Sequence, residues 1–432
     1  MELPKQLIDA IKFYKKGDLE KALDILNCET FTNENYYLVL KIYSSIYLKK
    51  REWSKFIDIN NKLIGFKEHK KQSLINIGNG KFNLGKISEA INYFETSIKE
   101  RGNNELVHQS LGVCYMENGK YEKSIENFIK AINLNKNNSK SVISVIYLLN
   151  FIKPKINMGN NILSANEKII SLNYKFNKEI PDNNTIKAIL EKSETSIKKY
   201  CNDVIYRESQ IFRRDFERLD CNRHFKVFNR FKVIPKYCFG CYKIQITTEN
   251  VVELIKLFFL FNQSLFKKSI LRKCMVETRN RVKGNYKGLI YFKNLEDSVE
   301  ALEKLKNKII ESKILTKNIE IKHGCTEFYG EYPDYKDINL AGPQKMTYDE
   351  KWSKYEEAID SENIKNNKHE SLITGSTLNL LTLADILIIR NWLNYAKLLG
   401  DKSYKEIFIN KIGVNFLDKI LKEQYDFRKS EL

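Results

Sequence analysis

In the first third of the chain, hydrophobic and small residues recur in helical spacing with one fixed repeat period. The segments that carry this pattern, YKKGDLEKAL, FNLGKISEAINYF and MENGKYEKSIENFIKAI, align on Gly17, Gly85 and Gly119. Gly85 and Gly119 are one period apart, and Gly17 lies two periods before Gly85, so the missing register falls at Arg51. Recurrence with a period of about 34 residues predicts an internally repeated structure.

Residues at other matching positions also recur one period apart, Gly78 with Gly112 and Phe94 with Phe128. These residues resemble the tetratricopeptide repeat family over residues 3–152, in four repeats of which the last two match best. The resemblance implies that each repeat is a helical hairpin, in which Gly78 and Gly112 let the two helices approach closely while Phe94 and Phe128 pack on the next hairpin. The first two repeats depart from the pattern, because they lack the small residue at the position of the two glycines.

The resemblance implies a right-handed superhelix whose concave face binds a peptide or a partner protein. The positions expected to face that groove are Asn76, Asn79, Asn83, Gln109 and Met116. The alternative, that these side chains are merely solvated, stays open. The chain does not show the Lys/Asn/Arg set with which such domains bind a C-terminal carboxylate, so no ligand is named.

A second pattern, of alternating strands and helices, occupies residues 242–325. Alternating or apolar runs predict strands and amphipathic runs predict helices. Their order is strand 242–246, helix 249–262, strand 273–279, strand 286–292, helix 295–310 and strand 319–325. This β-α-β-β-α-β order is that of a ferredoxin-like domain, in which the strands lie in the spatial order 4-1-3-2.

Four cysteines stand beside the ends of these strands. Cys238 and Cys241 form a CxxC before the first strand, Cys274 starts the second strand, and Cys325 ends the last. In the predicted sheet these places share one edge, which predicts a four-thiolate site for zinc or, alternatively, an iron–sulfur cluster. The segment before the first strand must then cross about 10 Å, two strand spacings of roughly 4.8 Å.

Other interpretations of the cysteines remain open. Cys221, His224 and His323 are spare ligands if one cysteine fails. The four thiols could also be ordinary buried side chains. A redox pair is the least favoured interpretation, because a reactive CxxC opens a helix, whereas this one precedes a strand.

Basic and aromatic residues are interleaved just before the CxxC. Residues 207–243 hold ten Lys/Arg against four Asp/Glu, with Phe212, Phe216, Phe225, Phe228 and Phe231 among them. Such a mixture can bind single-stranded RNA by phosphate contact and base stacking. The alternative is that the phenylalanines pack a helix onto the sheet and the arginines cover its rim.

Two observations limit the RNA interpretation. The segment NYKGLIYF matches the signature of RNA recognition motifs only in part, because Lys287 and Leu289 stand where stacking aromatics are expected. The basic residues would suit a small anion equally well. The candidates for either ligand are Arg213, Arg214, Arg223 and Arg279.

Composition changes this picture little. The formal charge of +19 suits nucleic acid or an anionic surface, but the abundance of Lys, Asn and Ile is also what an AT-rich genome produces. The N-terminus lacks the apolar region of a signal peptide, and the longest apolar run, residues 378–389, is too short to span a bilayer. We therefore expect a cytoplasmic protein without membrane insertion, whose eight cysteines are free thiols or metal ligands.

The remaining segments complete the expected division of the chain. The predicted parts are a repeat domain at 1–152, a linker with a helix at 153–200, a ferredoxin-like domain at 201–345 and C-terminal helices at 346–432. A helix is expected from about Thr185 into the 210s, an apolar helix capped by Ser376, and a last helix over 403–424. The apolar helix would dock on another domain or form a homodimer contact, and docking is preferred.

The sequence thus predicts a multi-domain adaptor. Tetratricopeptide repeats would bind a protein partner, and a ferredoxin-like module with a metal site would carry the specific role. A single-stranded RNA-binding protein and an enzyme with an iron–sulfur or anionic-substrate site are the alternatives, although no catalytic triad, phosphate-binding glycine loop or HExxH motif is present. The layout is also similar to that of bacterial proteins with N-terminal tetratricopeptide repeats, which supplies no activity.

Overall fold

The computed structural model describes residues 4–27, 33–155, 159–172, 180–201, 204–214, 219–263, 269–363, 380–407 and 421–432. Its internal contacts divide the chain into two compact units. Residues 1–141 with 362–370 form the first unit, and residues 142–361 with 371–432 form the second. Within the described ranges, no helix is both long enough and apolar enough to cross a membrane.

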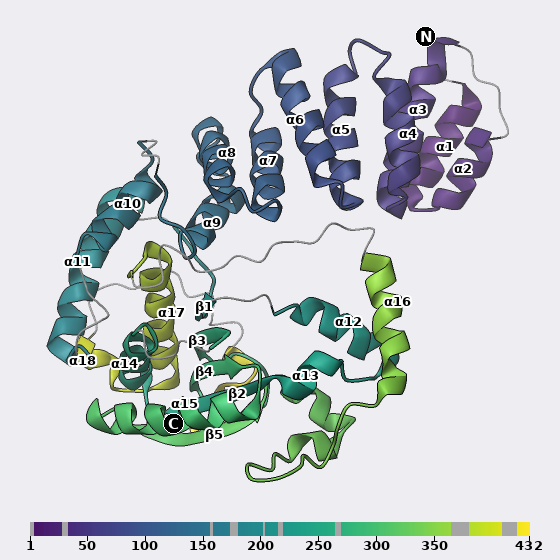
Figure 1. Cartoon of the computed structure of the whole chain (residues 1–432). Helices are drawn as coiled ribbons and strands as arrows, with labels where there is room; N and C mark the ends of the chain where they lie inside the picture. Colours follow the sequence, from purple (N-terminus) through teal and green to yellow (C-terminus); the bar gives the residue numbers. More distant parts are fainter. Residues whose placement is uncertain are drawn as a thin grey trace. The chain divides into compact units, whose positions relative to one another are not determined.

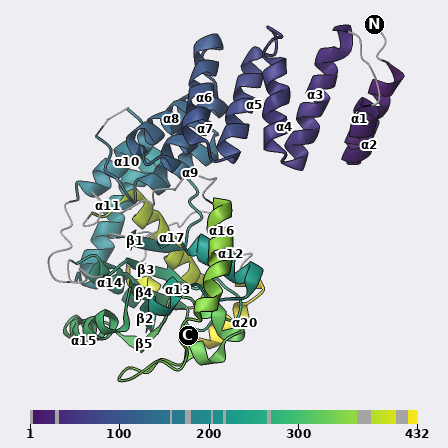
Figure 2. The same cartoon turned by 45° about the vertical axis from the view of Figure 1, so that its right-hand side comes forward.

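The first unit is a succession of helical hairpins. Its helices are α1 (Lys5–Lys16), α2 (Leu19–Asn27), α3 (Asn33–Lys50), α4 (Trp53–Leu63), α5 (Lys70–Asn83), α6 (Ile87–Arg101), α7 (Glu105–Glu117) and α8 (Tyr121–Leu134). Consecutive helices of this unit pack side by side, as the purple and blue part of the chain shows in both views (Figures 1 and 2). The predicted stack of hairpins is confirmed.

The turn inside each hairpin keeps the same backbone conformation from one repeat to the next. Gly17, Arg51, Gly85 and Gly119 all have a positive φ, of 86°, 56°, 74° and 68°. At each one, the amide of the next residue donates to the carbonyl five residues before it, as Lys86 does to Lys81. Arg51 therefore keeps the left-handed turn that its three glycine counterparts adopt more easily.

The helices of a hairpin approach each other closely at the two glycines predicted for this role. A Cβ on Gly78 would lie 2.7 Å from the ring of Phe94, and one on Gly112 would lie 2.6 Å from the ring of Phe128. The expectation that the first two repeats lack a small residue here is wrong. Ala10 stands two repeat periods before Gly78 and Ser44 one period before it, and both are buried.

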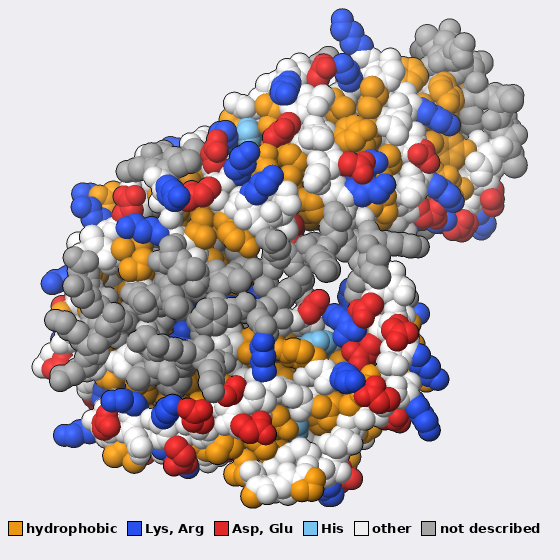
Figure 3. Space-filling model, viewed as in Figure 1, with side chains coloured by type: hydrophobic (Ala, Val, Ile, Leu, Met, Phe, Trp, Pro, Cys, Tyr) orange, Lys and Arg blue, Asp and Glu red, His pale blue; other side chains and the backbone are white. Residues whose placement is uncertain are grey.

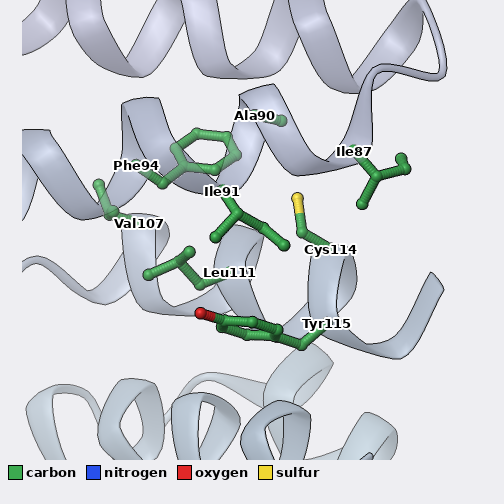
Figure 4. Packing of buried hydrophobic residues seen from close by; sticks show 8 residues of the cluster. All are labelled: Ile87, Ala90, Ile91, Phe94, Val107, Leu111, Cys114 and Tyr115. Carbon is green, nitrogen blue, oxygen red and sulfur yellow. The ribbon is translucent and has the colours of Figure 1, made fainter. Parts of the chain in front are cut away.

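The interior between α6 and α7 shows how one hairpin continues into the next. Ile91 and Phe94 of α6 lie beside Leu111 and Tyr115 of α7 in one buried cluster (Figure 4). The Tyr115 hydroxyl donates to Glu95 at 2.6 Å, so the aromatic ring is buried while its polar end is satisfied. Burial of these faces stabilises the stack, since no single hairpin could bury them alone.

The second unit surrounds one antiparallel sheet. Its helices are α9 (Ser139–Leu148, which begins in the first unit), α10 (Asn161–Ile170), α11 (Asn183–Cys201), α12 (Cys221–Phe231), α13 (Lys236–Gly240), α14 (Val251–Phe261), α15 (Leu295–Glu311), α16 (Ser353–Asn363), α17 (Leu383–Leu399), α18 (Tyr404–Ile407) and α20 (Tyr425–Ser430). Its strands are β1 (Gln210–Arg214), β2 (Tyr242–Thr248), β3 (Leu271–Val276), β4 (Tyr286–Phe292) and β5 (Thr316–His323).

The sheet has five strands in the order β1-β3-β4-β2-β5, and every pair is antiparallel. Helices α14 and α15 both pack on strands of this sheet. Gly288 marks the face under α14, because a Cβ there would lie 2.5 Å from Leu257 and 2.9 Å from Phe261. The six elements predicted between residues 242 and 325 are all present, with boundaries shifted by a few residues.

The edge strand β1 contradicts the prediction of a helix into the 210s. Helix α11 ends at Cys201, and residues 210–214 pair with β3 instead. Alternate residues Ile211 and Arg213 are buried, which is the period of a strand. The alternation was not recognised in the sequence, because one of the two buried positions is occupied by Arg213, and a charged residue is normally expected at the surface.

The apolar helix α17 docks on this sheet. Arg213 of β1 donates to Asp385 at 2.8 Å, and the indole of Trp392 donates to the Ser209 carbonyl at 2.8 Å. The helix begins after Thr382, which forms a capping box with Asp385. The predicted cap, Ser376, lies outside the described residues, as does most of the expected last helix.

Candidate functional site

A cleft of about 690 Å³ opens on the face of the sheet that α14 does not cover. Strand residues of alternating register point into it, because side chains of a strand face opposite sides in turn. They are Lys243, Gln245 and Thr247 of β2, Leu271 and Lys273 of β3, Lys287, Leu289 and Tyr291 of β4, and Asn318, Glu320 and Lys322 of β5. We call this the lysine cleft.

Two ammonium groups flank one tyrosine on its floor. The Nζ atoms of Lys243 and Lys273 lie 6.0 Å and 5.9 Å from the centre of the Tyr291 ring. Lys243 is only 6% exposed and donates to the Gly324 carbonyl at 2.8 Å. Burial lowers the pKa of Lys243 to about 8, and it lowers the pKa of Lys273 as well.

Neither of these two lysines forms an ion pair with a carboxylate in the part of the chain that the structure describes. The nearest polar partner of Lys273 is the Gln210 side chain, at 3.4 Å. Positive charge is therefore held in a half-closed, partly apolar space where, in the described ranges, only neutral groups lie within hydrogen-bonding distance, while Glu327 attracts both ammonium groups from farther away. Such an arrangement stabilises a visiting anion more than the same charges would on an open surface.

The third floor lysine is neutralised inside the fold. Lys287 and Arg279 both bind Glu277 at 2.8 Å. Burial opposes ionisation of Glu277, but the hydrogen bond from Arg279 and the charge of Lys287 hold its pKa at about 2. This triad anchors the sheet end, and it leaves Lys243 and Lys273 as the unmatched charges of the floor.

The predicted four-cysteine set does not assemble as expected. Cys274 is the fourth residue of β3 and pairs with Gly288, which places it on the face under α14. Cys325 and Cys221 line the lysine cleft on the opposite face. Strand β3 begins two residues earlier than predicted, so Cys274 lies within the strand and not at the sheet edge.

The other thiols form a looser cluster. Cys238 donates a hydrogen bond to Cys325, which lowers the pKa of Cys325 and, with burial, raises that of Cys238. Burial raises the pKa of Cys241 to about 12 and that of Cys221 to about 11. The CxxC cysteines are thus not each other's partners, and all the cysteines that the structure describes are free.

The spare histidine ligands lie in aromatic stacks. His323 lies between Tyr242 and Tyr335, with ring centres 4.7 Å and 3.9 Å away, and burial lowers its pKa to about 4. His224 stacks on Tyr237 at 5.3 Å. Across the described ranges, no group of three or more His, Cys, Asp or Glu side chains is arranged to hold a metal ion.

The four candidate arginines do not form one site. Arg213 is buried against Asp385, and Arg223 binds Glu356 at 2.7 Å and Asp360 at 2.6 Å. Arg279 lines the lysine cleft but is bound to Glu277 and Glu327. Arg214 lies over the Phe212 ring at 5.9 Å. Inclusion of Arg213 in a surface binding site is therefore wrong, because a ligand from solution cannot reach it.

The phenylalanines near the CxxC mostly pack inside the second unit. Phe225 and Phe228 of α12 pack on Phe328, with ring centres 6.0 Å and 4.5 Å apart, and Phe231 packs on Tyr355 at 4.9 Å. Phe216 lies outside the described residues. These contacts follow the alternative in which the aromatic residues hold a helix in place.

In the first unit, the candidate groove residues differ in what they contact. Asn76 donates to the buried Asn60 at 2.8 Å and accepts from Gln72 at 3.0 Å. Asn83 donates to the Asn79 carbonyl of its own helix at 2.8 Å. The side chains of Asn79, Gln109 and Met116 are half-exposed. Asn76 is thus a structural residue, and the other four remain available to a partner.

Family comparison matches one segment of the first unit. Residues 106–138, which cover α7 and α8, match the tetratricopeptide repeat model. The N-terminal part of the chain is a tetratricopeptide-repeat region. The match falls on one of the two repeats that fit the sequence pattern best, and left-handed turns at the matching positions continue back to Gly17.

Solved structures that are similar to part of this chain include MamA proteins. "Crystal structure of MamA" is 17% identical and covers 34% of this chain and 84% of its own, with a TM-score of 0.31. "MamA AMB-1 P212121" is 20% identical over 31% of this chain and 72% of its own, with a TM-score of 0.28. "MamA 41-end from Desulfovibrio magneticus RS-1" is 13% identical over 31% and 75%, at 0.29. No curated protein matches the chain.

The floor lysines were not among the site residues predicted from the sequence. Lys243, Lys273 and Lys287 each stand inside a strand, and Lys243 and Lys287 have uncharged neighbours on both sides, whereas Lys273 follows Arg272. Lysine is rare in central strands unless it has a partner or a role, so its recurrence in three paired strands was a usable signal. Lys287 was noted only as a departure from an RNA-binding signature.

Proposed function

We propose that this protein is an interaction scaffold whose tetratricopeptide-repeat region binds a partner protein. The observation that supports this proposal is the uninterrupted series of four identical hairpin turns, which extends one helical stack over the whole first unit. Stacks of this kind present an extended surface to a peptide or a protein. The residues proposed to contact the partner are Asn79, Asn83, Gln109 and Met116. The proposed location is the cytoplasm, because the described cysteines are free and free thiols are stable there.

Charge on the first unit is compatible with a protein partner. Lys and Arg side chains alternate with Asp and Glu over its visible face, without one patch of a single sign (Figure 3). The formal excess of +19 over the whole chain is therefore not a phosphate-binding surface on that face. Recognition by shape and by polar side chains is the better explanation.

Peptide selection followed by affinity measurement tests the proposal. Peptides selected on the intact chain are expected to bind less well, by about tenfold, after Asn79→Ala together with Gln109→Ala, since each buried hydrogen bond contributes about 0.5–1.5 kcal/mol. Asn92→Ala is the matched control, because Asn92 is exposed on α6, a helix outside the proposed contact set. Equal loss in both variants, or no selectable peptide, would contradict the proposal.

We further propose that the sheet unit is of the ferredoxin-like class. The order β5-β2-β4-β3 corresponds to 4-1-3-2 in that fold, and α14 and α15 occupy the two connections. Strand β1 would then be an addition at the edge beside β3. A structural comparison restricted to residues 242–323 would test this.

The zinc or iron–sulfur prediction stays a prediction and carries no function here. The residues as placed do not fit a four-thiolate site, because Cys274 lies on the face under α14, whereas Cys325 lines the lysine cleft on the opposite face. A four-thiolate site would need Cys221 in place of Cys274, and the four thiols would have to move closer together. Metal analysis of protein purified without oxygen, with Cys221→Ser and Cys274→Ser compared, would decide it.

A further inference from the structure

The lysine cleft combines three properties of a small-molecule site. Eight Lys and Arg side chains line it against three Glu side chains. Apolar residues such as Leu219, Phe225 and Leu289 share the lining. The volume of about 690 Å³ lies in the range of about 300–1,000 Å³ that is usual for ligand pockets.

Within the described part of the chain, two positive charges on the floor have no carboxylate at ion-pair distance, although Glu327 attracts both from farther away. Lys287 is matched by Glu277 at 2.8 Å and Lys322 by Glu320 at 2.7 Å. Lys243 and Lys273 have no such carboxylate among the described residues, although both are largely buried. Burial of an ammonium group without a counter-charge is unfavourable, so these two positions favour a ligand that brings the anion.

We propose that the lysine cleft binds a small organic phosphate. The phosphate would lie between the ammonium groups of Lys243 and Lys273, above Tyr291. The organic part would contact the apolar lining near Leu219 and Phe225. This inference does not depend on partner binding by the tetratricopeptide-repeat region.

The walls of the cleft favour a small ligand over an RNA strand. Lys336 and Tyr329, from the segment after β5, are part of the lining. Glu431 also lines the cleft, and it accepts a hydrogen bond from the Gly284 amide at 2.7 Å. Tyr291 is flanked by two lysines, and Lys287 and Leu289 replace stacking aromatics, so the floor offers no platform for successive bases.

Calorimetric titration of the full chain tests the inference. The probes are inorganic pyrophosphate, adenosine monophosphate and uridine monophosphate, with adenosine as the ligand that lacks phosphate. We expect at least one phosphorylated probe to bind and adenosine not to bind. Lys243→Met and Lys273→Met should each weaken the binding by about tenfold or more, because each removes a charge-assisted hydrogen bond.

Controls separate loss of the site from loss of the fold. Lys304→Met replaces a lysine with a 68% exposed side chain on α15 and should leave the affinity unchanged. The thermal unfolding temperature of the floor variants should not fall, since methionine is less costly to bury than an unpaired ammonium. Three results would overturn the proposal: no binding of any probe at millimolar concentration, equal binding by the floor variants, or tighter binding of a ten-nucleotide RNA that depends on the same lysines.

Discussion

At the scale of single residues, Arg51 shows that a repeat turn can survive the loss of its glycine. Its φ of 56° lies in the left-handed region, and its amide and that of Glu52 make the hydrogen bonds seen at the three glycine turns. An L-residue with a side chain is strained there by roughly 1–2 kcal/mol. The packing of the surrounding helices therefore determines the left-handed conformation of Arg51.

Arg51→Gly is therefore expected to stabilise the first unit. Relief of the strain should raise the free energy of unfolding by about 0.5–1 kcal/mol, after about 0.4–1 kcal/mol is offset by the greater freedom of glycine in the unfolded chain. Gly17→Arg should have the opposite effect. A Cβ at this position would contact no atom within 4 Å, so the positive φ is the source of the strain. Urea unfolding of both variants measures this, and a destabilised Arg51→Gly would refute it.

His323 predicts a pH dependence of stability. Its pKa is about 4 in the folded chain, below the ordinary 6.5, because the ring is buried between Tyr242 and Tyr335 with Lys243 nearby. The unfolded state binds more protons between these values, so stability should fall as the pH drops from 6.5 towards 4, by up to about 3 kcal/mol.

His323→Phe should flatten that dependence while it keeps the aromatic stack. Denaturant unfolding between pH 4.5 and 7 is the measurement, because Glu277 makes most of its own contribution to the pH dependence below this range. Burial also lowers the pKa of His224, so a smaller slope of the same sign should remain in the variant. An unchanged slope would mean that His323 protonates freely in the folded protein.

At the scale of helices, polar contacts replace the glycine–phenylalanine contact in one repeat. Asn60 stands one repeat period before Phe94, and Ser44 stands one period before Gly78. Asn60 donates to Ser44 at 2.9 Å and to the Phe56 carbonyl at 2.8 Å. A hydrogen-bonded pair thus performs the packing that an aromatic ring performs in the next two repeats.

Asn76 completes this chain of hydrogen bonds from the following repeat. Asn76→Ala would leave the Oδ1 of fully buried Asn60 without its donor, and should lower the free energy of unfolding by about 1–3 kcal/mol. Asn83→Ala, on the same helix but exposed, should change it by less than about 0.5 kcal/mol. Similar values for both variants would show that Asn76 is only a surface residue.

The ion pair between β1 and α17 predicts a larger effect. Arg213 and Asp385 are 3% and 0% exposed, so Asp385→Ala would leave an uncompensated buried charge and cost about 3–5 kcal/mol. Glu300→Ala, which breaks the exposed pair with Lys304 on α15, should cost about 0.5 kcal/mol or less. Chemical unfolding compares the two, and equal costs would contradict the role of Arg213 in docking.

Local patterns predicted the elements well and the site poorly. The repeat period of the first unit and the strand–helix alternation of the second depend on neighbours in the sequence, and both appear in the structure. Cys274 was misplaced because one face of a strand differs from the other by a single residue of register. Asp385 and Arg213 are 172 residues apart, and no local pattern could pair them.

At the scale of the whole molecule, the two compact units are expected to unfold separately. Differential scanning calorimetry should resolve two transitions. Arg51→Gly should move one of them and Asp385→Ala the other, because the two residues belong to different units. If each variant moved both transitions together, the chain would be a single cooperative unit.

Strand β5 forms the outer edge of the sheet, and its place there bears on self-association. An unpaired strand edge offers amide and carbonyl groups to any second edge that approaches, which is a common first step of aggregation. Lys317, Glu320 and Lys322 place charges along this strand, and these charges must lose water before another strand could pair. The same residues that border the lysine cleft therefore also help keep separate copies of the sheet apart at high concentration.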